Sequence, residues 1–292
     1  MTGGGAPLEA RSAVPERVGV LGGGRMGAGI AHAFVLAGAH VTIVERDEDA
    51  AAAARDRVEQ AIDGSLERGL EADRASLVAS LATATDAAAF AGCGLVVEAV
   101  PEDPALKAEA LARAEAAIDE TSVLATNTSS IGIGSLAGAL ARPRRFVGLH
   151  FFNPVPASRL VEVVVGDATD AQVVADAQGW VEALGKAAVT VRDSPGFASS
   201  RLGVMLGLEA IRMLEEGVAS VADIDAAMEL GYRHPMGPLR TTDVVGLDVR
   251  LGIAEQLEAE LGERFAPPAL LRRMVAEGRL GRKSGRGFYD YD

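Results

Sequence analysis

The first half of the chain alternates short, continuous apolar runs with longer alanine-rich stretches that carry charges. Buried β-strands are expected at four of these runs, 17–21, 41–44, 95–100 and 123–125. Helices are expected over 26–37 and 49–64, and a third from about Pro104, because proline suits a first helical turn. Strands that are apolar throughout and alternate with helices indicate a parallel sheet covered on both faces.

After Asp193 the pattern becomes almost entirely helical. Ser194-Pro195 is expected to begin a helix, as an N-cap followed by a proline, and apolar residues then recur at helical spacing. Further helices are expected from about 222, within 239–261 and over 268–277. These patterns predict a flexible tail at 1–14, an α/β domain at 15–193 and an all-α domain at 194–292.

Composition narrows the class of protein. A chain of 292 residues with 49% hydrophobic residues suits one large or two ordinary globular domains. No apolar run approaches the ~20 residues that span a bilayer, and residues 1–14 lack the apolar core of a signal peptide. A single cysteine, Cys93, excludes an intrachain disulfide and is expected to be a buried small residue. No Cys/His cluster has zinc spacing, so no metal is expected, and a cytoplasmic protein is predicted.

The net charge of −13 argues against nucleic acid as a partner, since no basic stripe is present. An anionic substrate would be repelled unless a local patch of arginine or lysine overrides this field. Lysine occurs only at Lys107, Lys186 and Lys283, so these three positions are of particular interest.

A glycine motif directly follows the first predicted strand. Gly22-Gly23-Gly24-Arg25-Met26-Gly27 matches G-x-G-x-x-G, in which Gly22 allows a tight turn, Gly24 admits a pyrophosphate and Gly27 lets helix and strand pack closely. Glu45, at the end of the next strand, can bind ribose hydroxyls and would repel a 2′-phosphate. The motif predicts a Rossmann-type site for NAD, although Arg46 could tolerate NADP. No G-K-[ST] follows, so a triphosphate P-loop is excluded.

A second motif carries a candidate base. His150 ends an apolar run and is followed by two aromatic residues and Asn153-Pro154-Val155-Pro156, and Glu162 lies on the next apolar run. A carboxylate beside a histidine fixes the ring tautomer and raises its basicity, as general-base catalysis requires. These residues alone also fit a histidine at a strand end and a glutamate that faces solvent.

The order of these and other motifs identifies a family resemblance. The motifs are Gly22–Ala31, Glu98–Glu102, Asn127–Ser130, Gly148–Pro156, Ser194–Phe197, Pro235–Pro238 and Gly285–Tyr289. From about residue 17 to the C-terminus the chain resembles the short-chain L-3-hydroxyacyl-CoA dehydrogenases, especially the bacterial 3-hydroxybutyryl-CoA dehydrogenases. The resemblance implies a Rossmann-type, doubly wound, mostly parallel sheet, followed by an all-α C-terminal domain for substrate binding and dimerisation.

The resemblance also implies roles for individual residues. His150 would take the proton from the substrate 3-hydroxyl, Glu162 would hold and polarise His150, and Ser129 would bind the substrate oxygen. Besides the glycine loop and Glu45, cofactor contacts would come from Glu102, Lys107, Asn127, Asn153 and Lys283. Three of these have simpler alternatives: a solvated helix residue for Lys107, a turn former for Asn153 and an exposed charge for Lys283.

The chain departs from the family pattern at one position, Ser200, and in the composition of one helix. Ser200 stands where the family has an asparagine that donates toward the substrate carbonyl; a serine is shorter but is still a donor. For CoA, Ser65 and Arg68 are the nearest candidates, and the lysine-rich character common at that helix is missing. Both residues equally fit ordinary positions on a charged helix surface.

The function implied is reversible NAD-dependent oxidation of a short-chain L-3-hydroxyacyl-CoA, a reaction used in fatty-acid β-oxidation among other pathways. The expected partners are an acyl-CoA and a second copy of the chain, through the C-terminal domain, with neither nucleic acid nor membrane. Two alternatives stay open: a dehydrogenase of a free 3-hydroxy acid, similar to the L-gulonate 3-dehydrogenases, and a dinucleotide-binding protein without turnover.

Overall fold

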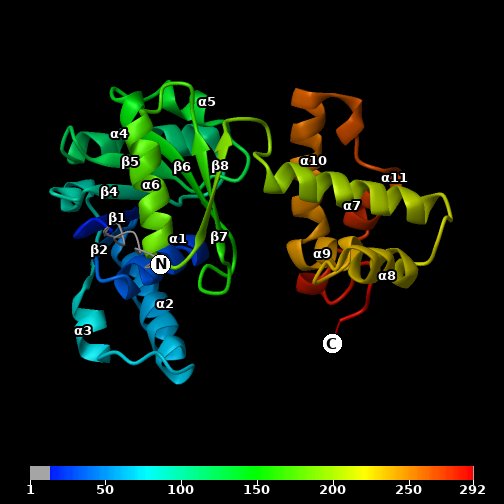
Figure 1. Cartoon of the computed structure of the whole chain (residues 1–292), viewed down its shortest axis with the longest axis horizontal. Coiled ribbons are helices and arrows are strands. Elements are labelled where there is room, and N and C mark those ends of the chain that lie inside the picture. The colour runs from blue at the N-terminus through cyan, green and yellow to red at the C-terminus, as the bar shows by residue number, and fades with distance from the viewer. Residues whose placement is uncertain (1–13, 292) are drawn as a thin grey trace, which may run out of the picture. The chain divides into compact units, whose positions relative to one another are not determined.

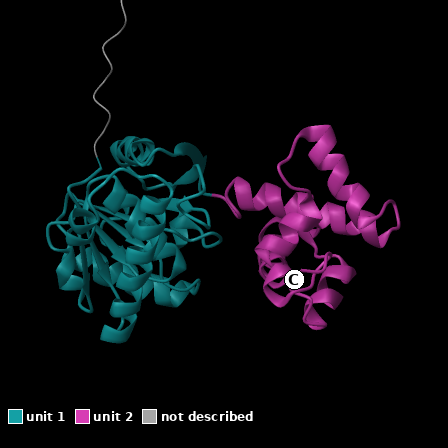
Figure 2. Ribbon diagram, turned by 90° about the horizontal axis from the view of Figure 1, so that it is seen from below, with its two compact units in different colours: residues 1–193 teal, residues 194–292 magenta. Residues whose placement is uncertain are grey.

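The structure, a computed structural model, describes residues 14–291. It divides into two compact units with the boundary between Asp193 and Ser194 (Figure 2). Of the tail expected at 1–14, residues 1–13 lie outside the described residues, and Val14 packs partly buried against the core of the first unit. Among residues 14–291, no helix is both long and apolar enough to cross a membrane.

The first unit is built on one eight-stranded sheet with the order β3-β2-β1-β4-β5-β6-β7-β8 (Figure 1). The strands are β1 (Arg17–Leu21), β2 (His40–Val44), β3 (Leu81–Ala84), β4 (Leu95–Glu98), β5 (Val123–Thr126), β6 (Phe146–Phe151), β7 (Leu160–Val165) and β8 (Ala187–Arg192). Only β6 and β7 pair in antiparallel fashion, and all other neighbours are parallel. The predicted mostly parallel sheet is therefore confirmed.

Six α-helices connect these strands. They are α1 (Arg25–Leu36), α2 (Glu48–Glu67), α3 (Arg74–Ala79), α4 (Pro104–Ala117), α5 (Ile133–Ala137) and α6 (Ala171–Ala183), with short 3-10 turns η1 (Ala87–Phe90) and η2 (Pro143–Arg145). Apolar residues of α1, α2 and α6 join the buried strand residues in one core cluster. α4 begins at Pro104 as expected, and the Asp103 carboxylate caps it by accepting the Leu106 N–H.

The second unit is helical, as predicted. It contains α7 (Ser199–Glu215), α8 (Val221–Tyr232), α9 (Pro238–Val245), α10 (Leu247–Leu261) and α11 (Ala269–Ala276), with turns η3 (Glu263–Phe265) and η4 (Arg282–Ser284). Its own core is apolar and includes Val204, Leu208, Ile211, Leu257 and Phe265. The C-terminal segment is fastened to this core because the buried Asp243 accepts the N–H groups of Phe288 and Tyr289.

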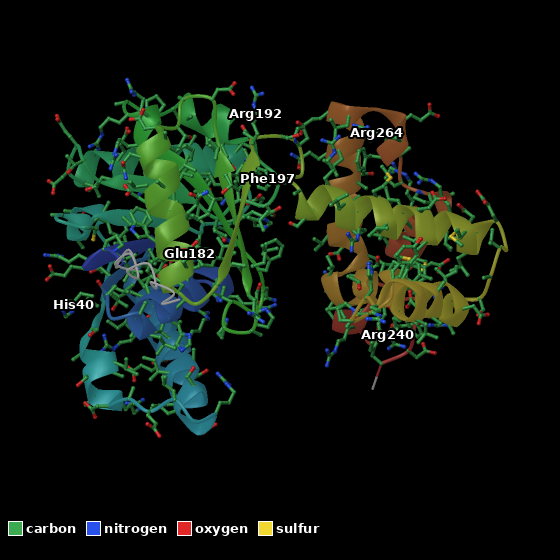
Figure 3. The ribbon with its side chains drawn as sticks, viewed as in Figure 1. His40, Glu182, Arg192, Phe197, Arg240 and Arg264 are labelled. Atoms are coloured by element: carbon green, nitrogen blue, oxygen red, sulfur yellow. The ribbon has the colours of Figure 1, made fainter. Side chains whose placement is uncertain are left out.

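The expected helix start at Ser194-Pro195 is wrong. The Phe197 N–H donates to the Ser194 carbonyl, closing a turn in which Gly196 and Phe197 have positive φ angles of 71° and 50° (Phe197 is labelled in Figure 3). A right-handed helix cannot pass through residues with positive φ. Helix α7 therefore begins only at Ser199, with Ala198 as its N-cap.

Candidate active site

Several of the candidate residues lie at one edge of the sheet. Gly22 follows β1, Glu45 follows β2 and Asn127 follows β5, and the carboxyl ends of parallel strands meet at the same edge. β1 and β4 are neighbours from which the chain proceeds in opposite directions across the sheet. Such a switch point is where open α/β sheets bind their ligands.

The loop between β1 and α1 has the backbone that a dinucleotide needs. Gly22 has a φ of 92°, and its N–H donates to the Val44 carbonyl at 2.9 Å. A Cβ atom at Gly27 would lie 1.8 Å from the Gly22 carbonyl oxygen, whereas one at Gly24 would meet nothing within 4 Å. The close packing needed at Gly27 and the open space needed at Gly24 for a pyrophosphate are both present.

A hollow of about 590 Å³ opens beside this loop. Arg25, Met26 and Glu45 line it, together with Ala99, Val100 and Pro101 after β4. One Glu45 carboxylate oxygen accepts the Gly23 N–H at 2.6 Å, which fixes the acid beside the glycine loop. These residues therefore fit a dinucleotide, and the role of Glu45 in binding ribose hydroxyls stays a prediction.

The candidate base and its carboxylate face each other on adjacent strands. His150 on β6 is the register partner of Glu162 on β7, and their Nδ1 and Oε2 atoms are 2.8 Å apart. The two side chains are 7% and 1% exposed, so this pair sits in a dry environment. An ionised Glu162 can only accept a hydrogen bond, so the Nδ1–H group of His150 donates to it and Nε2 carries the lone pair that a base requires. The solvent-facing alternative for Glu162 is therefore wrong.

Asn127 and Asn153 both lie near the end of β6, the strand that carries His150. The Asn127 side-chain oxygen accepts the Phe151 N–H at 2.9 Å, so it ties the end of β5 to the residue after the base. Asn153 is exposed, two residues after β6. The Phe152 ring lies 4.4 Å from the His150 ring between centroids and covers one side of it.

Glu102 accepts several hydrogen bonds from the loop that carries Ser129. One of its carboxylate oxygens accepts the Thr128 hydroxyl at 2.6 Å, the Ser129 N–H at 3.0 Å and the Ser130 N–H at 3.1 Å. Burial alone would raise the pKa of Glu102, but the Lys107 ammonium and these hydrogen bonds outweigh it and hold the pKa below its usual value. Glu102 is thus ionised and holds the Ser129 loop through these hydrogen bonds.

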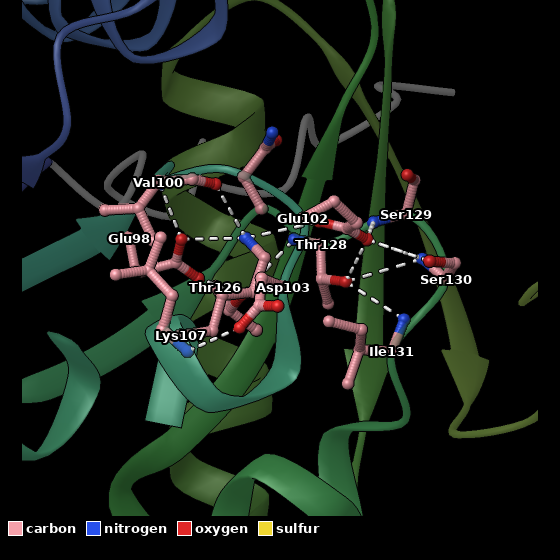
Figure 4. A network of polar contacts seen from close by, with 12 residues as sticks. Glu98, Val100, Glu102, Asp103, Lys107, Thr126, Thr128, Ser129, Ser130 and Ile131 are labelled. Carbon is pink, nitrogen blue, oxygen red and sulfur yellow. Dashed lines mark hydrogen bonds and ion pairs between the residues drawn. The ribbon is translucent and has the colours of Figure 1, made fainter. Parts of the chain in front are cut away.

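Lys107 is not the solvated helix residue of the simpler alternative. It is 1% exposed, and its ammonium contacts Glu98 at 2.8 Å, the Val100 carbonyl at 3.1 Å and Glu102 at 3.3 Å (Figure 4). Sequence reasoning did not select Glu98 as a site residue, although it is fully buried at the end of β4. A charged residue inside an otherwise apolar strand was the available signal.

Ser65 and Arg68 come together at a second hollow of about 760 Å³ in the first unit. Arg68 donates to the Ser65 hydroxyl at 3.3 Å, and His32 contacts the same hydroxyl at 3.1 Å. Lys186 also lines the hollow and donates to the carbonyls of Val155 and Ser158 in the loop after β6. Ser65 is buried, so the surface alternative fails for Ser65, and for the exposed Arg68 both readings stay open.

The remaining two candidates belong to the second unit. Ser200 lies in the first turn of α7, and Lys283 lies in η4, where its ammonium donates to Asp248 at 2.6 Å. The described residues contain no group of three or more His, Cys, Asp or Glu side chains placed to hold a metal ion. Cys93 is buried, as expected.

Both units match models of known families. Residues 17–194 match the model for the NAD binding domain of 3-hydroxyacyl-CoA dehydrogenase, and residues 196–291 match that for its C-terminal domain. A 3-hydroxybutyryl-CoA dehydrogenase of Mycobacterium tuberculosis is 44% identical over 281 residues, which cover 94% of this chain and 98% of that protein. The human mitochondrial hydroxyacyl-coenzyme A dehydrogenase is 39% identical over 98% of this chain and 94% of its own length.

A solved structure supports the same family. The crystal structure of (S)-3-hydroxybutyryl-CoA dehydrogenase PaaH1 from Ralstonia eutropha superposes with a TM-score of 0.91 at 39% identity, covering 95% of this chain and 99% of that one. The two family models together span nearly all of the described residues, and relatives well above 30% identity are matched over almost their full length. The chain therefore belongs to the 3-hydroxyacyl-CoA dehydrogenase family, and its cofactor is NAD.

Proposed function

We propose that this enzyme oxidises the 3-hydroxyl of a short-chain L-3-hydroxyacyl-CoA, such as L-3-hydroxybutyryl-CoA, with NAD, and that His150 is the general base. The observation that carries the proposal is the buried His150–Glu162 pair, with 2.8 Å between Nδ1 and Oε2, in the same unit as the dinucleotide loop. A protein that only binds a dinucleotide would have no use for such a base.

The proposed reaction couples a proton transfer to a hydride transfer. NAD, when bound, supplies the acceptor for the hydride that leaves C3 of the substrate. His150 Nε2 takes the hydroxyl proton as the C–O bond becomes a carbonyl, and Glu162 stabilises the positive charge that then develops on the ring. In the reverse direction the protonated His150 returns the proton to the carbonyl oxygen. The Ser129 hydroxyl binds the substrate oxygen, and Glu102 holds the Ser129 backbone in place.

The CoA moiety is assigned to the hollow beside α2. Ser65, Arg68 and Lys186 line it, and two of these side chains are cationic in a protein with a net charge of −13. Phosphate groups would meet a local positive field there, as an anionic substrate of this protein requires. Pro154, Pro156 and Ala157 also line the hollow and follow the strand that carries His150, so one ligand could reach both places.

For the second unit we propose three roles that follow from the family. Ser200 donates toward the substrate thioester carbonyl, Lys283 contributes to cofactor binding, and exposed apolar side chains form a homodimer interface. Leu202, Leu206, Val218, Leu230 and Tyr232 are 65%, 43%, 59%, 83% and 74% exposed in this unit, and such residues mark association surfaces where they cluster. A cytoplasmic location, consistent with the single cysteine, is also proposed.

The test measures NADH formation at its near-ultraviolet absorbance with L-3-hydroxybutyryl-CoA and with free L-3-hydroxybutyrate. Wild type is expected to turn over the thioester only, and His150→Ala to lose about 10²–10⁴-fold in kcat, the usual contribution of a general base. His40→Ala is the matched control, because His40 is exposed at the amino end of β2. Turnover of the free acid alone, or full activity in His150→Ala, would refute the proposal.

A further inference from the structure

One buried charge of the second unit, Arg250 on α10, lacks a partner among the described residues. The residue is only 5% exposed. Its Nε atom is buried without a hydrogen-bond partner, and no carboxylate of residues 14–291 forms an ion pair with its guanidinium. Burial lowers the pKa of Arg250 to about 10, so the side chain stays cationic at neutral pH. Because arginine is almost never buried so deeply unless it is paired, this side chain calls for an anion that the chain itself does not supply.

The guanidinium of Arg250 lies along α7 and points toward the first turn of that helix. A Cβ atom at Gly207 would lie 3.4 Å from Arg250 Nε, and one at Gly203, a turn earlier, would lie 3.6 Å from Nη1. Glycine inside a helix costs about 1 kcal/mol relative to alanine. At these two positions it leaves the room that the guanidinium occupies, so that Nη1 reaches toward the N-terminal end of α7.

Ser200 lies on the same face of α7, three residues before Gly203. Side chains three residues apart on a helix are about 5–6 Å from each other, so Nη1 of Arg250 comes within about one turn of the Ser200 side chain. The N-terminal end of a helix also carries a partial positive charge that favours anions. A full positive charge, a hydroxyl donor and a favourable helix end are thus combined in one place.

We infer that Arg250 binds a carboxylate at the far end of the acyl chain, so that the preferred substrate is the CoA thioester of a short 3-hydroxy-dicarboxylic acid. This inference rests on the proposed function, in which Ser200 binds the thioester carbonyl. A chain of a few carbon atoms then spans the turn of helix between Ser200 and Arg250. A carboxylate would neutralise the buried charge and accept two N–H groups of the guanidinium, whereas a methyl group at the end of the chain would leave the charge unpaired.

The test compares two substrates that differ only at the end of the acyl chain: L-3-hydroxyadipyl-CoA, with a carboxylate, and L-3-hydroxyhexanoyl-CoA, with a methyl group. For wild type, kcat/KM is expected to be at least about tenfold higher for the dicarboxylic thioester, a difference of roughly 1.4 kcal/mol. Arg250→Met fills much of the same space without the charge and should abolish this preference. Its melting temperature without ligand should not fall, because the substitution removes a buried charge that has no partner.

Two further variants separate the guanidinium from general effects of charge. Gly203→Leu places a branched side chain over Nη1 and should lower kcat/KM for the dicarboxylic thioester only. The matched control is Arg212→Met in the last turn of the same helix, where Arg212 pairs with Glu209. It changes the net charge equally and should leave the preference intact.

The inference is overturned if wild type does not prefer the dicarboxylic thioester, if Arg250→Met retains the preference, or if the control loses it to the same extent. A wild type that oxidises neither thioester would instead refute the proposed function.

Discussion

Single carboxylates inside apolar strands carry much of the chemistry of this molecule. Glu98 and Glu162 are 0% and 1% exposed, and each is compensated by a specific donor: Lys107 for the first, His150 for the second. A hydrophobic residue could fill either place without the cost of burying an ionisable group. These carboxylates provide orientation: Glu162 holds the His150 ring, and Glu98 holds the Val100 backbone and the Thr126 hydroxyl.

Ser200 is the residue where this chain departs from its family, and its hydroxyl is expected to do the work of the usual asparagine. Ser200→Ala removes the donor and leaves the thioester carbonyl without its hydrogen bond, which should lower kcat/KM by about 10- to 100-fold, because an unsatisfied buried polar group costs about 1–3 kcal/mol. Ser200→Asn should stay within about tenfold of wild type. Steady-state kinetics with L-3-hydroxybutyryl-CoA measure both variants.

The neighbouring Ser199→Ala tests whether the effect belongs to Ser200 or to any hydroxyl in the first turn of α7. A kcat/KM for Ser199→Ala close to wild type supports the assignment. If Ser200→Ala instead keeps full activity, Ser200 makes no contact that matters to the reaction, and the thioester carbonyl is bound by other groups.

His32 should make the stability of the first unit depend on pH. Burial, the nearby Arg68 and, more weakly, Lys186 lower its pKa below 6.5, while a hydrogen bond to the Ala61 backbone raises it slightly. Between the lowered folded pKa and 6.5 the unfolded chain binds more protons, so stability falls as the pH falls through this window. Urea unfolding of wild type and His32→Gln at about pH 8 and about pH 5 should show the larger loss in wild type.

The control for this experiment is His40→Gln, because His40 is exposed and should leave the pH dependence unchanged. Equal losses in wild type and His32→Gln would mean that other groups, such as the carboxylates, account for the whole acid effect.

At the scale of elements, the sequence was sufficient to predict strands and helices where the hydrophobic pattern was continuous. β1, β2, β4, β5, α1 and α2 follow their predicted ranges to within a few residues, and α4 begins at the predicted Pro104. β3 was not predicted, because Leu81-Ala82-Thr83-Ala84 is small and only partly buried and lacks the apolar run of a central strand. The turn at Ser194–Ala198 was mistaken for a helix start because a serine–proline pair fits both, and only the positive φ angles decide between them.

The candidate site could be predicted only as far as motifs reach. Local sequence patterns that indicate a specific chemistry contain the glycine loop, Glu45, His150 and Glu162. The group of hydrogen bonds accepted by Glu102 is different, because it joins residues 26 to 28 positions apart whose own sequences are those of ordinary loops. Likewise, no local pattern connects Ser65 with His32 or Lys186 with the loop after β6. Such contacts arise from the packing of the sheet and cannot be inferred from neighbours in sequence.

At the scale of the whole molecule, the two units divide the work that the family carries out. The first contains the dinucleotide loop, the His150–Glu162 pair and a cationic hollow, all within residues 14–193. For the second, we have proposed roles for Ser200 and Lys283 and a homodimer interface. This helical unit of 99 residues has its own core and leaves several large apolar side chains exposed, as the proposed homodimer interface requires.

The exposed apolar side chains of the second unit bear on how the protein assembles. If the exposed apolar side chains of α7 and α8 form the proposed homodimer interface, wild type should sediment at twice the chain mass of 30.1 kDa. Leu206→Glu/Leu230→Glu places two negative charges of each chain in the symmetric contact and should shift the protein to monomer, because a charge buried without a partner is costly. Both residues are exposed within the chain, so its melting temperature should change only through loss of the partner. Val189→Glu, on the exposed face of β8, is the matched control and should leave the mass unchanged. A double variant that still sediments at twice the chain mass would place the interface elsewhere, and a monomeric wild type would remove the homodimer from the proposed function.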